Sequence, residues 1–285
     1  MSRIFDALQR SGVEQTGIEY LDTVSVATKV FELPVPEQAP ANSLTDFPNV
    51  VAALSSSAHI AVITDPESLA AEKFRFLGVR MRQLQQSRLI KRVLVTSSIA
   101  GEGKSLVSAN LASVLARRKR QKVLLVEGDL RRPVLAAQFG LGNLAGLAEW
   151  LRTDEKSLSN IYHLEGPDFW LMPAGYPPAN PLELLQSSRF SGLIAQLTEL
   201  FDWIIIDSPP LLPLADTTVL ARVTDGALLV VREGATERAP LQRSLESLKK
   251  LDLLGVVLNS SSNGSHHSYY HSYAEPAKDA RKIKA

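Results

Sequence analysis

The sequence predicts an α/β fold in which a parallel β-sheet is sandwiched by helices, with an extension before it and a tail after it. Three observations support this prediction. Apolar strand-like segments alternate with helical stretches from residue 92 to residue 259, a glycine-bracketed loop joins the first strand to a helix, and two later strands end in carboxylates. Such alternation is typical of parallel sheets covered on both faces by right-handed crossovers.

The predicted elements follow one another in a regular order. We expect strands near residues 92–97, 122–127, 168–172, 202–207, 226–232 and 253–258. We expect helices over residues 66–86, 105–115, 188–200 and 237–250. The first helix should have Asp65 as its N-cap and Pro66 in its first turn, since proline is favoured at the first helical position.

Composition excludes several classes of protein. The chain has 285 residues, of which 45% are hydrophobic, enough for one α/β domain of about 200 residues plus extensions. The absence of cysteine excludes disulfides, thiol catalysis and cysteine-bound metals. The net charge of +1 gives no overall reason to bind nucleic acid. The basic run at residues 117–120 is explained as a helix end, where cations favour the helix dipole.

The ends of the chain differ in composition from its centre. Residues 1–57 resemble an extension or linker, because prolines recur at positions 34, 36, 40 and 48. No apolar run approaches the ~18 residues that a membrane span needs, and no signal peptide is visible. We therefore expect a soluble, cytoplasmic chain.

The glycine-bracketed loop predicts a phosphate-binding site. Gly101 and Gly103 can adopt the backbone angles that turn successive N–H groups inward, and the helix that follows adds its positive end. Lys104 can reach terminal phosphates, and the Ser105 hydroxyl can bind Mg²⁺. The nucleotide-binding stretch comprises Ala100, Gly101, Glu102, Gly103, Lys104, Ser105 and Leu106. Ser98 stands where the usual Walker A pattern has its first glycine.

Two acidic strand ends complete the predicted site. Glu127 and Asp129 follow one strand, and Asp207 ends another. Strand-end carboxylates often only cap the next helix or hold a turn. Beside a phosphate loop, however, they indicate a metal–nucleotide site, because phosphoryl transfer uses Mg²⁺ bound by carboxylates and phosphates. The candidate catalytic residues are Lys104, Glu127, Asp129 and Asp207, and the candidate magnesium ligands are Ser105, Glu127, Asp129 and Asp207.

In the order and combination of its phosphate loop and two acidic strand ends, the chain resembles the cytoplasmic domain of bacterial tyrosine kinases. That group has a MinD/ParA-like P-loop fold and controls capsule and exopolysaccharide export. Residues 96–105 match its Walker A motif, residues 127–133 its Walker A′ motif and residues 205–210 its Walker B motif, while residues 173–185 are similar to a further family segment. The resemblance covers roughly residues 60–273 and implies ATP and Mg²⁺ as cofactors. We divide the chain into an extension (1–57), a P-loop kinase domain (58–262) and a flexible tail (263–285).

The tail carries the most kinase-specific feature. Tyr269, Tyr270 and Tyr273 form a cluster that holds half of the six tyrosines. A segment with so few aliphatic residues cannot bury enough surface to fold alone. The resemblance implies that these tyrosines accept phosphate in a neighbouring subunit of a ring. The alternatives are an inert terminus or a weak metal-binding tract of His266, His267 and His271.

Three departures from the family pattern bear on activity and assembly. Glu127 replaces the usual aspartate and extends the carboxylate by roughly 1.5 Å. Asp129 then carries more of the base or metal role. Ala100 replaces a common proline, and Gly78 replaces the last arginine of a self-assembly pattern that otherwise includes Glu72 and Arg75. By family analogy Asn259 contacts adenine; the alternative is a residue that only ends a strand.

The resemblance also implies partners. We expect a separate membrane-bound activator or polysaccharide co-polymerase, recruitment by it to the inner face of the membrane, a homo-oligomeric ring and an opposing tyrosine phosphatase. The predicted function is an ATP-dependent tyrosine autokinase acting in trans. Two alternatives stay open: a MinD/ParA-type ATPase, disfavoured because Ile99 stands where that class has a lysine, and a catalytically weak, nucleotide-dependent regulatory scaffold.

Overall fold

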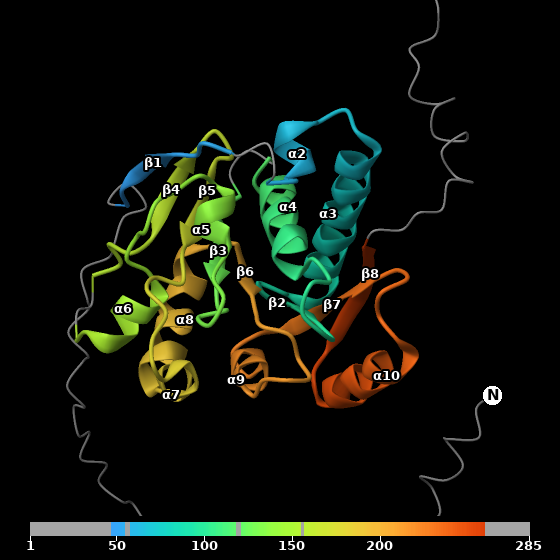
Figure 1. Cartoon of the computed structure of the whole chain (residues 1–285). Coiled ribbons are helices and arrows are strands. Elements are labelled where there is room, and N and C mark those ends of the chain that lie inside the picture. Colours follow the sequence, from blue (N-terminus) through green and yellow to red (C-terminus); the bar gives the residue numbers. More distant parts are fainter. Residues whose placement is uncertain (1–46, 55–57, 118–120, 155–156, 260–285) are drawn as a thin grey trace, which may run out of the picture. The chain divides into compact units, whose positions relative to one another are not determined.

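The computed structural model describes residues 47–54, 58–117, 121–154 and 157–259. An eight-stranded sheet forms their centre, with the strand order β1-β4-β5-β3-β6-β2-β7-β8 (Figure 1). The strands are β1 (Asn49–Val51), β2 (Arg92–Ser97), β3 (Val123–Glu127), β4 (Tyr162–Glu165), β5 (Phe169–Met172), β6 (Trp203–Asp207), β7 (Gly226–Arg232) and β8 (Leu253–Asn259). All six expected strands are confirmed, with bounds that differ by one residue at most.

The sheet is mostly, but not wholly, parallel. Every neighbouring pair is parallel except β4 and β5, which form an antiparallel hairpin. The sequence analysis predicted neither β4 nor β1. The hairpin turn contains Gly166 and Asp168, both with positive φ, which lets the chain reverse within three residues. The strand β1 lies in the range expected to be an extension and pairs with β4 at the sheet edge.

Helices cover both faces of the sheet, as predicted, and each face has its own apolar core. Side chains alternate along the central strands, so that Leu124 packs in one core and Leu125 in the other. The first core packs against α6 (Leu147–Arg152), α7 (Pro181–Gln186), α8 (Ser188–Leu200), α9 (Asp216–Ala221) and α10 (Arg238–Ser247). The second packs against α2 (Ala61–Thr64), α3 (Leu69–Arg88), α4 (Lys104–Ala116) and α5 (Leu135–Gln138).

The start predicted for the first long helix is wrong. Helix α3 begins at Leu69, and its N-cap is Ser68, whose hydroxyl accepts a hydrogen bond from the Ala71 N–H at 3.2 Å. Asp65 instead closes the short helix α2, because its N–H donates to the Ala61 carbonyl. The end of α2 and the start of α3 thus both lie in the region where the sequence predicted the start of a single helix. The other expected helices are present, and a 3₁₀ turn (Leu248–Lys250) extends α10 to the predicted end.

Gly78 has a packing reason that the sequence did not show. It is buried on α3, and a Cβ at this position would lie 2.3 Å from the Val114 Cγ1 atom of α4. The glycine therefore permits the two helices to approach closely. An arginine, which the family's assembly pattern places here, does not fit unless the Val114 side chain or α4 moves.

This contact predicts opposite effects for two helix-interior glycines. Gly78→Ala should lower the free energy of unfolding by about 1–2 kcal/mol, because overpacking outweighs the gain in helix propensity. Gly192→Ala in α8, where a Cβ meets nothing within 4 Å, should raise it by about 0.5–1 kcal/mol. Chemical denaturation of both variants measures the two changes. A stabilised Gly78→Ala variant would contradict the packing argument.

Candidate active site

The three predicted motifs meet at the carboxyl ends of neighbouring strands. In the sheet β6 lies between β2 and β3, and Asp207 is in register with Val95 on one side and Glu127 on the other. The Gly128 N–H donates to the Asp207 carbonyl at 2.7 Å, and a Cβ on Gly128 would lie 2.9 Å from that oxygen. The pairing of the strands thus brings the phosphate loop and both acidic segments to one place.

The phosphate loop has the conformation that its glycines predicted. Gly101 and Gly103 have φ values of 84° and 89°, which side-chain-bearing residues adopt only with strain. Helix α4 begins directly at Lys104, and Ser105 lies buried in its first turn. The loop amides and the positive end of this helix therefore surround one position, where they can bind an anion.

A brace of side chains holds the loop from the β7 and β8 side. The buried Glu102 carboxylate accepts hydrogen bonds from the Ile99 N–H (2.8 Å) and from the Thr236 hydroxyl. The Asn259 side-chain amide donates to the Glu102 carbonyl at 2.9 Å. A Cβ on Gly103 would lie 2.2 Å from the Asn259 Nδ2 atom. Glu102 and Asn259 thus fix the loop in the described structure.

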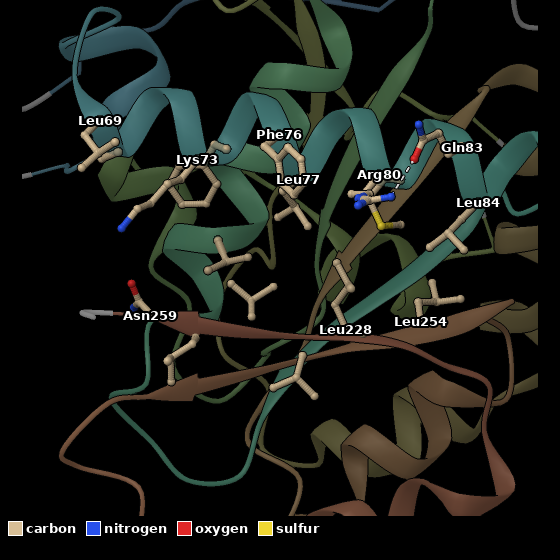
Figure 2. A pocket seen from close by; sticks show the side chains of 18 of the residues that line it. Leu69, Lys73, Phe76, Leu77, Arg80, Gln83, Leu84, Leu228, Leu254 and Asn259 are labelled. Atoms are coloured by element: carbon tan, nitrogen blue, oxygen red, sulfur yellow. Dashed lines mark hydrogen bonds between the residues drawn. The ribbon is translucent and has the colours of Figure 1, made fainter. Parts of the chain in front are cut away.

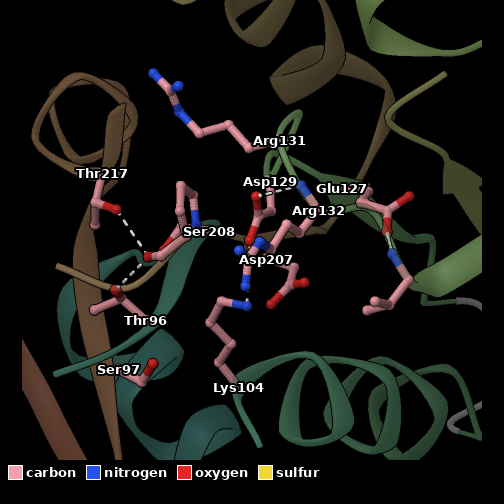
Figure 3. A network of polar contacts seen from close by, with 12 residues as sticks. Thr96, Ser97, Lys104, Glu127, Asp129, Arg131, Arg132, Asp207, Ser208 and Thr217 are labelled. Atoms are coloured by element: carbon pink, nitrogen blue, oxygen red, sulfur yellow. Dashed lines mark hydrogen bonds and ion pairs between the residues drawn. The ribbon is translucent and has the colours of Figure 1, made fainter. Parts of the chain in front are cut away.

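Lys104 faces a carboxylate across the site. Its Nζ atom lies 3.3 Å from the Asp129 Oδ2 atom, and both side chains are largely buried (Figure 3). The other Asp129 oxygen accepts the Arg132 N–H at 3.1 Å. Arg131 points away from Lys104 and forms a two-pronged ion pair with the buried Asp216 at the start of α9. The Walker A′ segment is thereby held at both ends, with Asp129 directed into the site.

Asp207 is the most deeply buried carboxylate of the site. Burial raises the pKa of Asp207 to about 7, while Lys104 and the hydroxyls of Ser105 and Ser108 act in the opposite direction. The Ser108 hydroxyl donates to Oδ1 at 3.1 Å, whereas Oδ2 is buried without a hydrogen-bond partner in the described part of the chain. A buried carboxylate oxygen without a donor fits a site for a cation and its bound water.

Glu127 has different neighbours from the other three candidates. Its Oε1 atom accepts the N–H groups of Val134 (2.5 Å) and Leu135 (2.6 Å), and its Oε2 atom accepts the Ala174 N–H at 3.0 Å. Burial raises the pKa of Glu127, and these three hydrogen bonds oppose that shift. Figure 3 shows Glu127 to one side of the Lys104–Asp129 pair. It therefore holds two loops together in this structure.

Metal binding at this site requires more than protein side chains. Within the described residues no group of three or more His, Cys, Asp or Glu side chains is arranged to hold a metal ion. Ser105 follows Lys104 in the chain, and Asp129 and Asp207 lie close to Lys104. This arrangement fits Mg²⁺, since that ion is usually held by one or two carboxylates together with substrate phosphates and water.

Sequence reasoning missed several residues that organise the site. Ser108 lies one helical turn after Lys104, so its spacing from Ser105 was a readable signal. Thr236, Arg131 and Asp216 contact their partners only through the fold, and no local pattern indicates them. Tyr269, Tyr270 and Tyr273, together with the histidine tract, lie outside the described residues.

A separate apolar groove of about 950 Å³ runs between α3 and the edge strand β8 (Figure 2). Phe76, Val256 and Leu258 expose 60%, 53% and 56% of their surface there. The Arg80 guanidinium lies over the Phe76 ring, 5.1 Å from its centroid. Asn259, which hydrogen bonds to the phosphate loop, also lines this groove.

The fold and the site together define a P-loop nucleotide-binding protein. Residues 93–283 match the model of the CobQ/CobB/MinD/ParA nucleotide binding domain. A cobyrinic acid a,c-diamide synthase from Mycobacterium smegmatis, solved with an ATP analogue and magnesium, shares this fold with 21% identity and a TM-score of 0.52 over 65% of this chain and 79% of that one.

Closer relatives are kinases. Tyrosine-protein kinase YwqD of Bacillus subtilis is 34% identical over 218 residues, which cover 74% of this chain and 90% of that protein. The kinase domain of Escherichia coli tyrosine kinase ETK has 28% identity and a TM-score of 0.66, covering 71% of this chain and 82% of that domain. The chimerical protein CapA2B2 has 30% identity and a TM-score of 0.67, and the match covers 73% of this chain and 92% of that one. The full-length E. coli Etk is much longer, and the match covers 27% of it.

The chain therefore belongs to the CobQ/CobB/MinD/ParA family. Within that family it is a member of the bacterial tyrosine kinases of capsule and exopolysaccharide biosynthesis, which confirms the resemblance drawn from its motifs. Among the described helices none is long and apolar enough to cross a membrane.

The brace predicts that Thr236 affects nucleotide affinity. Thr236→Val removes the hydroxyl but keeps the shape, and leaves the buried Glu102 carboxylate without one of its donors. The dissociation constant for a nucleoside triphosphate should rise about 5–30-fold, which corresponds to roughly 1–2 kcal/mol. Thr236→Ser, the matched control, should bind like the parent chain. Titration calorimetry with Mg²⁺ and a non-hydrolysable analogue measures both, and equal affinities would contradict the role of the brace.

Proposed function

We propose that the chain is an ATP-dependent protein-tyrosine autokinase that phosphorylates its own tail cluster, Tyr269, Tyr270 and Tyr273, in trans. One observation carries the proposal: the phosphate loop places Lys104 against Asp129 and beside the buried Asp207. A phosphate site, a metal-binding carboxylate and a second carboxylate directed toward the reacting centre are the parts that phosphoryl transfer requires.

Each residue has a defined role in the proposed site. The amides of residues 100–106 and the Lys104 ammonium would bind the β- and γ-phosphates of ATP. Ser105 and Asp207 would hold Mg²⁺, which fits the partnerless Asp207 oxygen. When bound, Mg²⁺ would neutralise charge on the phosphates. Asn259, which lies against Gly103, would contact the adenine ring.

Asp129 is the residue we propose as base. Its Oδ2 atom faces Lys104, so the carboxylate is paired with the ammonium until phosphates attract Lys104 away. The tyrosine oxygen would then attack the γ-phosphorus, the bond to the β,γ-bridging oxygen would break, and Asp129 would accept the phenolic proton. The products are ADP and phosphotyrosine. Glu127 is less suited to this step, since three backbone N–H groups occupy its carboxylate.

The partners follow from family membership. A separate membrane-bound activator, of the polysaccharide co-polymerase type, would recruit the cytoplasmic chain to the inner face of the membrane, and a phosphatase would reverse the reaction. The similar CapA2B2 is a chimerical protein, which supports a partner of this kind. Ring assembly would rely on Glu72 and Arg75, which form an exposed 2.7 Å ion pair on α3.

A nucleotide-dependent regulatory scaffold is the second candidate. The hydrogen bonds of Glu127 to backbone amides favour the scaffold, because they hold away from the phosphate site a carboxylate that the family normally has there. Such a chain would bind ATP through Lys104 and Asp207 and transfer phosphate slowly or not at all.

Mass spectrometry of the full chain distinguishes the two functions. After incubation with Mg²⁺-ATP, with and without a candidate activator, the kinase should carry phosphate on the peptide that contains residues 269–273. Lys104→Met should abolish it, because the lysine binds the transferred phosphate. Lys122→Met changes an exposed lysine distant from the loop and should leave it intact. ATP binding without any tail phosphate would favour the scaffold.

The base assignment makes a second prediction. Asp129→Asn should lower the rate of tail phosphorylation by about 10²–10⁴-fold, because it removes the proton acceptor. The affinity for ATP should change far less, since the phosphate loop is untouched. Rapid-quench kinetics and calorimetry measure the two quantities, and an unchanged transfer rate would exclude Asp129 as the base.

A further inference from the structure

A small pocket lies beside Glu127, on the other side of β6 from β2 and the phosphate loop. It has a volume of about 160 Å³ and is formed by α5 with the segments that flank it and by the loop after β5. Its lining includes Glu127 and two segments that we call its walls, one with Pro133 and Val134 and one with Pro173, Tyr176 and Pro177. Cavities of about 150 Å³ accommodate a benzene ring. The pocket is thus of the right size for one aromatic side chain.

Glu127 holds the two walls of this pocket at a fixed distance. One carboxylate oxygen accepts the N–H groups of Val134 and Leu135 in the first wall, and the other accepts the Ala174 N–H in the second. All three bonds are 3.0 Å or shorter, and Glu127 is 1% exposed. The extra methylene of glutamate, compared with aspartate, lets one carboxylate reach both walls.

Two large hydrophobic residues of the pocket lining are accessible. Val134 and Tyr176 expose 39% and 53% of their surface, although both are large hydrophobic residues. They stand on opposite walls, so an entering ring would be covered from two sides. Proline and tyrosine are well suited to such contact, because aromatic rings pack favourably on both.

The position of the pocket indicates which substrate meets it. The strand order places β3 and β5 on the opposite side of β6 from β2, whose end carries the phosphate loop. Phosphoryl transfer is roughly in line, so the acceptor approaches the γ-phosphate from the side opposite the nucleotide. We assign that side to Asp129, the proposed base, and to the pocket, because the nucleotide would stay on the phosphate loop. The acceptor, rather than the nucleotide, is therefore the neighbour of the pocket.

We propose that this pocket, held together by Glu127, binds an aromatic side chain next to the acceptor tyrosine, supplied by the tail of a second copy of the chain. The proposal rests on the proposed kinase function. The tail provides the occupant, since Tyr269, Tyr270 and Tyr273 lie within five residues, and any one of them has an aromatic neighbour when it is the acceptor. Tyr269 is ten residues beyond Asn259, which gives the tail a reach of roughly 35 Å.

The experiment compares two acceptors that differ only in neighbouring rings. Both are full chains with Lys104→Met, so that they cannot phosphorylate themselves, and Tyr270 is their only tail tyrosine. One has Tyr269→Phe and Tyr273→Phe, and the other has Tyr269→Ala and Tyr273→Ala. The enzyme is the full chain with all three tail tyrosines changed to alanine. We expect kcat/KM to be about tenfold higher, or more, for the phenylalanine acceptor than for the alanine acceptor, because only the phenylalanine acceptor can bury a neighbouring ring in the pocket.

A substitution in the pocket tests whether the pocket binds the ring next to the acceptor tyrosine. Ala137 is exposed and lines the pocket on α5. Ala137→Phe in the enzyme should fill the pocket and remove the preference, whereas Ala137→Ser, the matched control, should keep it. Equal rates for the two acceptors with the parent enzyme, or a preference that survives Ala137→Phe, would overturn the proposal.

Peptide binding separates this proposal from the kinase function. Peptides of residues 265–277 with phenylalanine or alanine at positions 269 and 273 are titrated into the full chain with three tail alanines and a non-hydrolysable ATP analogue. We expect the phenylalanine peptide to bind roughly tenfold more tightly than the alanine peptide, and this difference to be lost in Ala137→Phe. That result supports the pocket even if no acceptor is phosphorylated. In that case only the proposed function fails. Equal affinities overturn the pocket whether or not phosphate is transferred.

Discussion

The parallel pairing of β6 with both β2 and β3 assembles the whole site. It places Asp207 in register with Val95 and Glu127, so that a loop and two acidic segments distant in sequence end side by side. The close contact of Gly128 with the Asp207 carbonyl then holds the second acidic segment against the strand end. A shift of either strand by one residue would turn these side chains to the opposite face.

The phosphate loop is held by residues that come from the far end of the chain. Thr236 follows β7 and Asn259 ends β8, yet both hydrogen bond to Glu102. Asn259 also directly precedes the segment that carries the tyrosine cluster. The last described residue before the tail therefore contacts the phosphate loop directly.

The two Walker A′ carboxylates have separate tasks in this structure. Asp129 faces Lys104, with one oxygen bound to a backbone amide and the other directed to the ammonium. Glu127 instead satisfies three amides of two neighbouring loops and lines a small pocket. A buried carboxylate is costly unless it is hydrogen bonded, and these bonds offset part of the cost of burying Glu127. The replacement of aspartate by glutamate is thus accommodated by a structural role.

Local sequence patterns were sufficient to predict six of the eight strands, the four longest helices apart from the start of α3, and the phosphate loop. Alternation, glycine spacing and strand-end carboxylates are visible within short segments. They also predicted that Lys104, Asp129 and Asp207 lie together at one edge of the sheet, because parallel topology brings these strand ends to one place. Only the folded chain showed three further features. Glu127 holds two loops together, glycine at position 78 lets α3 and α4 approach closely, and Thr236 braces the phosphate loop. Those three facts depend on contacts between segments far apart in the chain, for which side-chain packing and hydrogen bonding leave no signal in the local sequence.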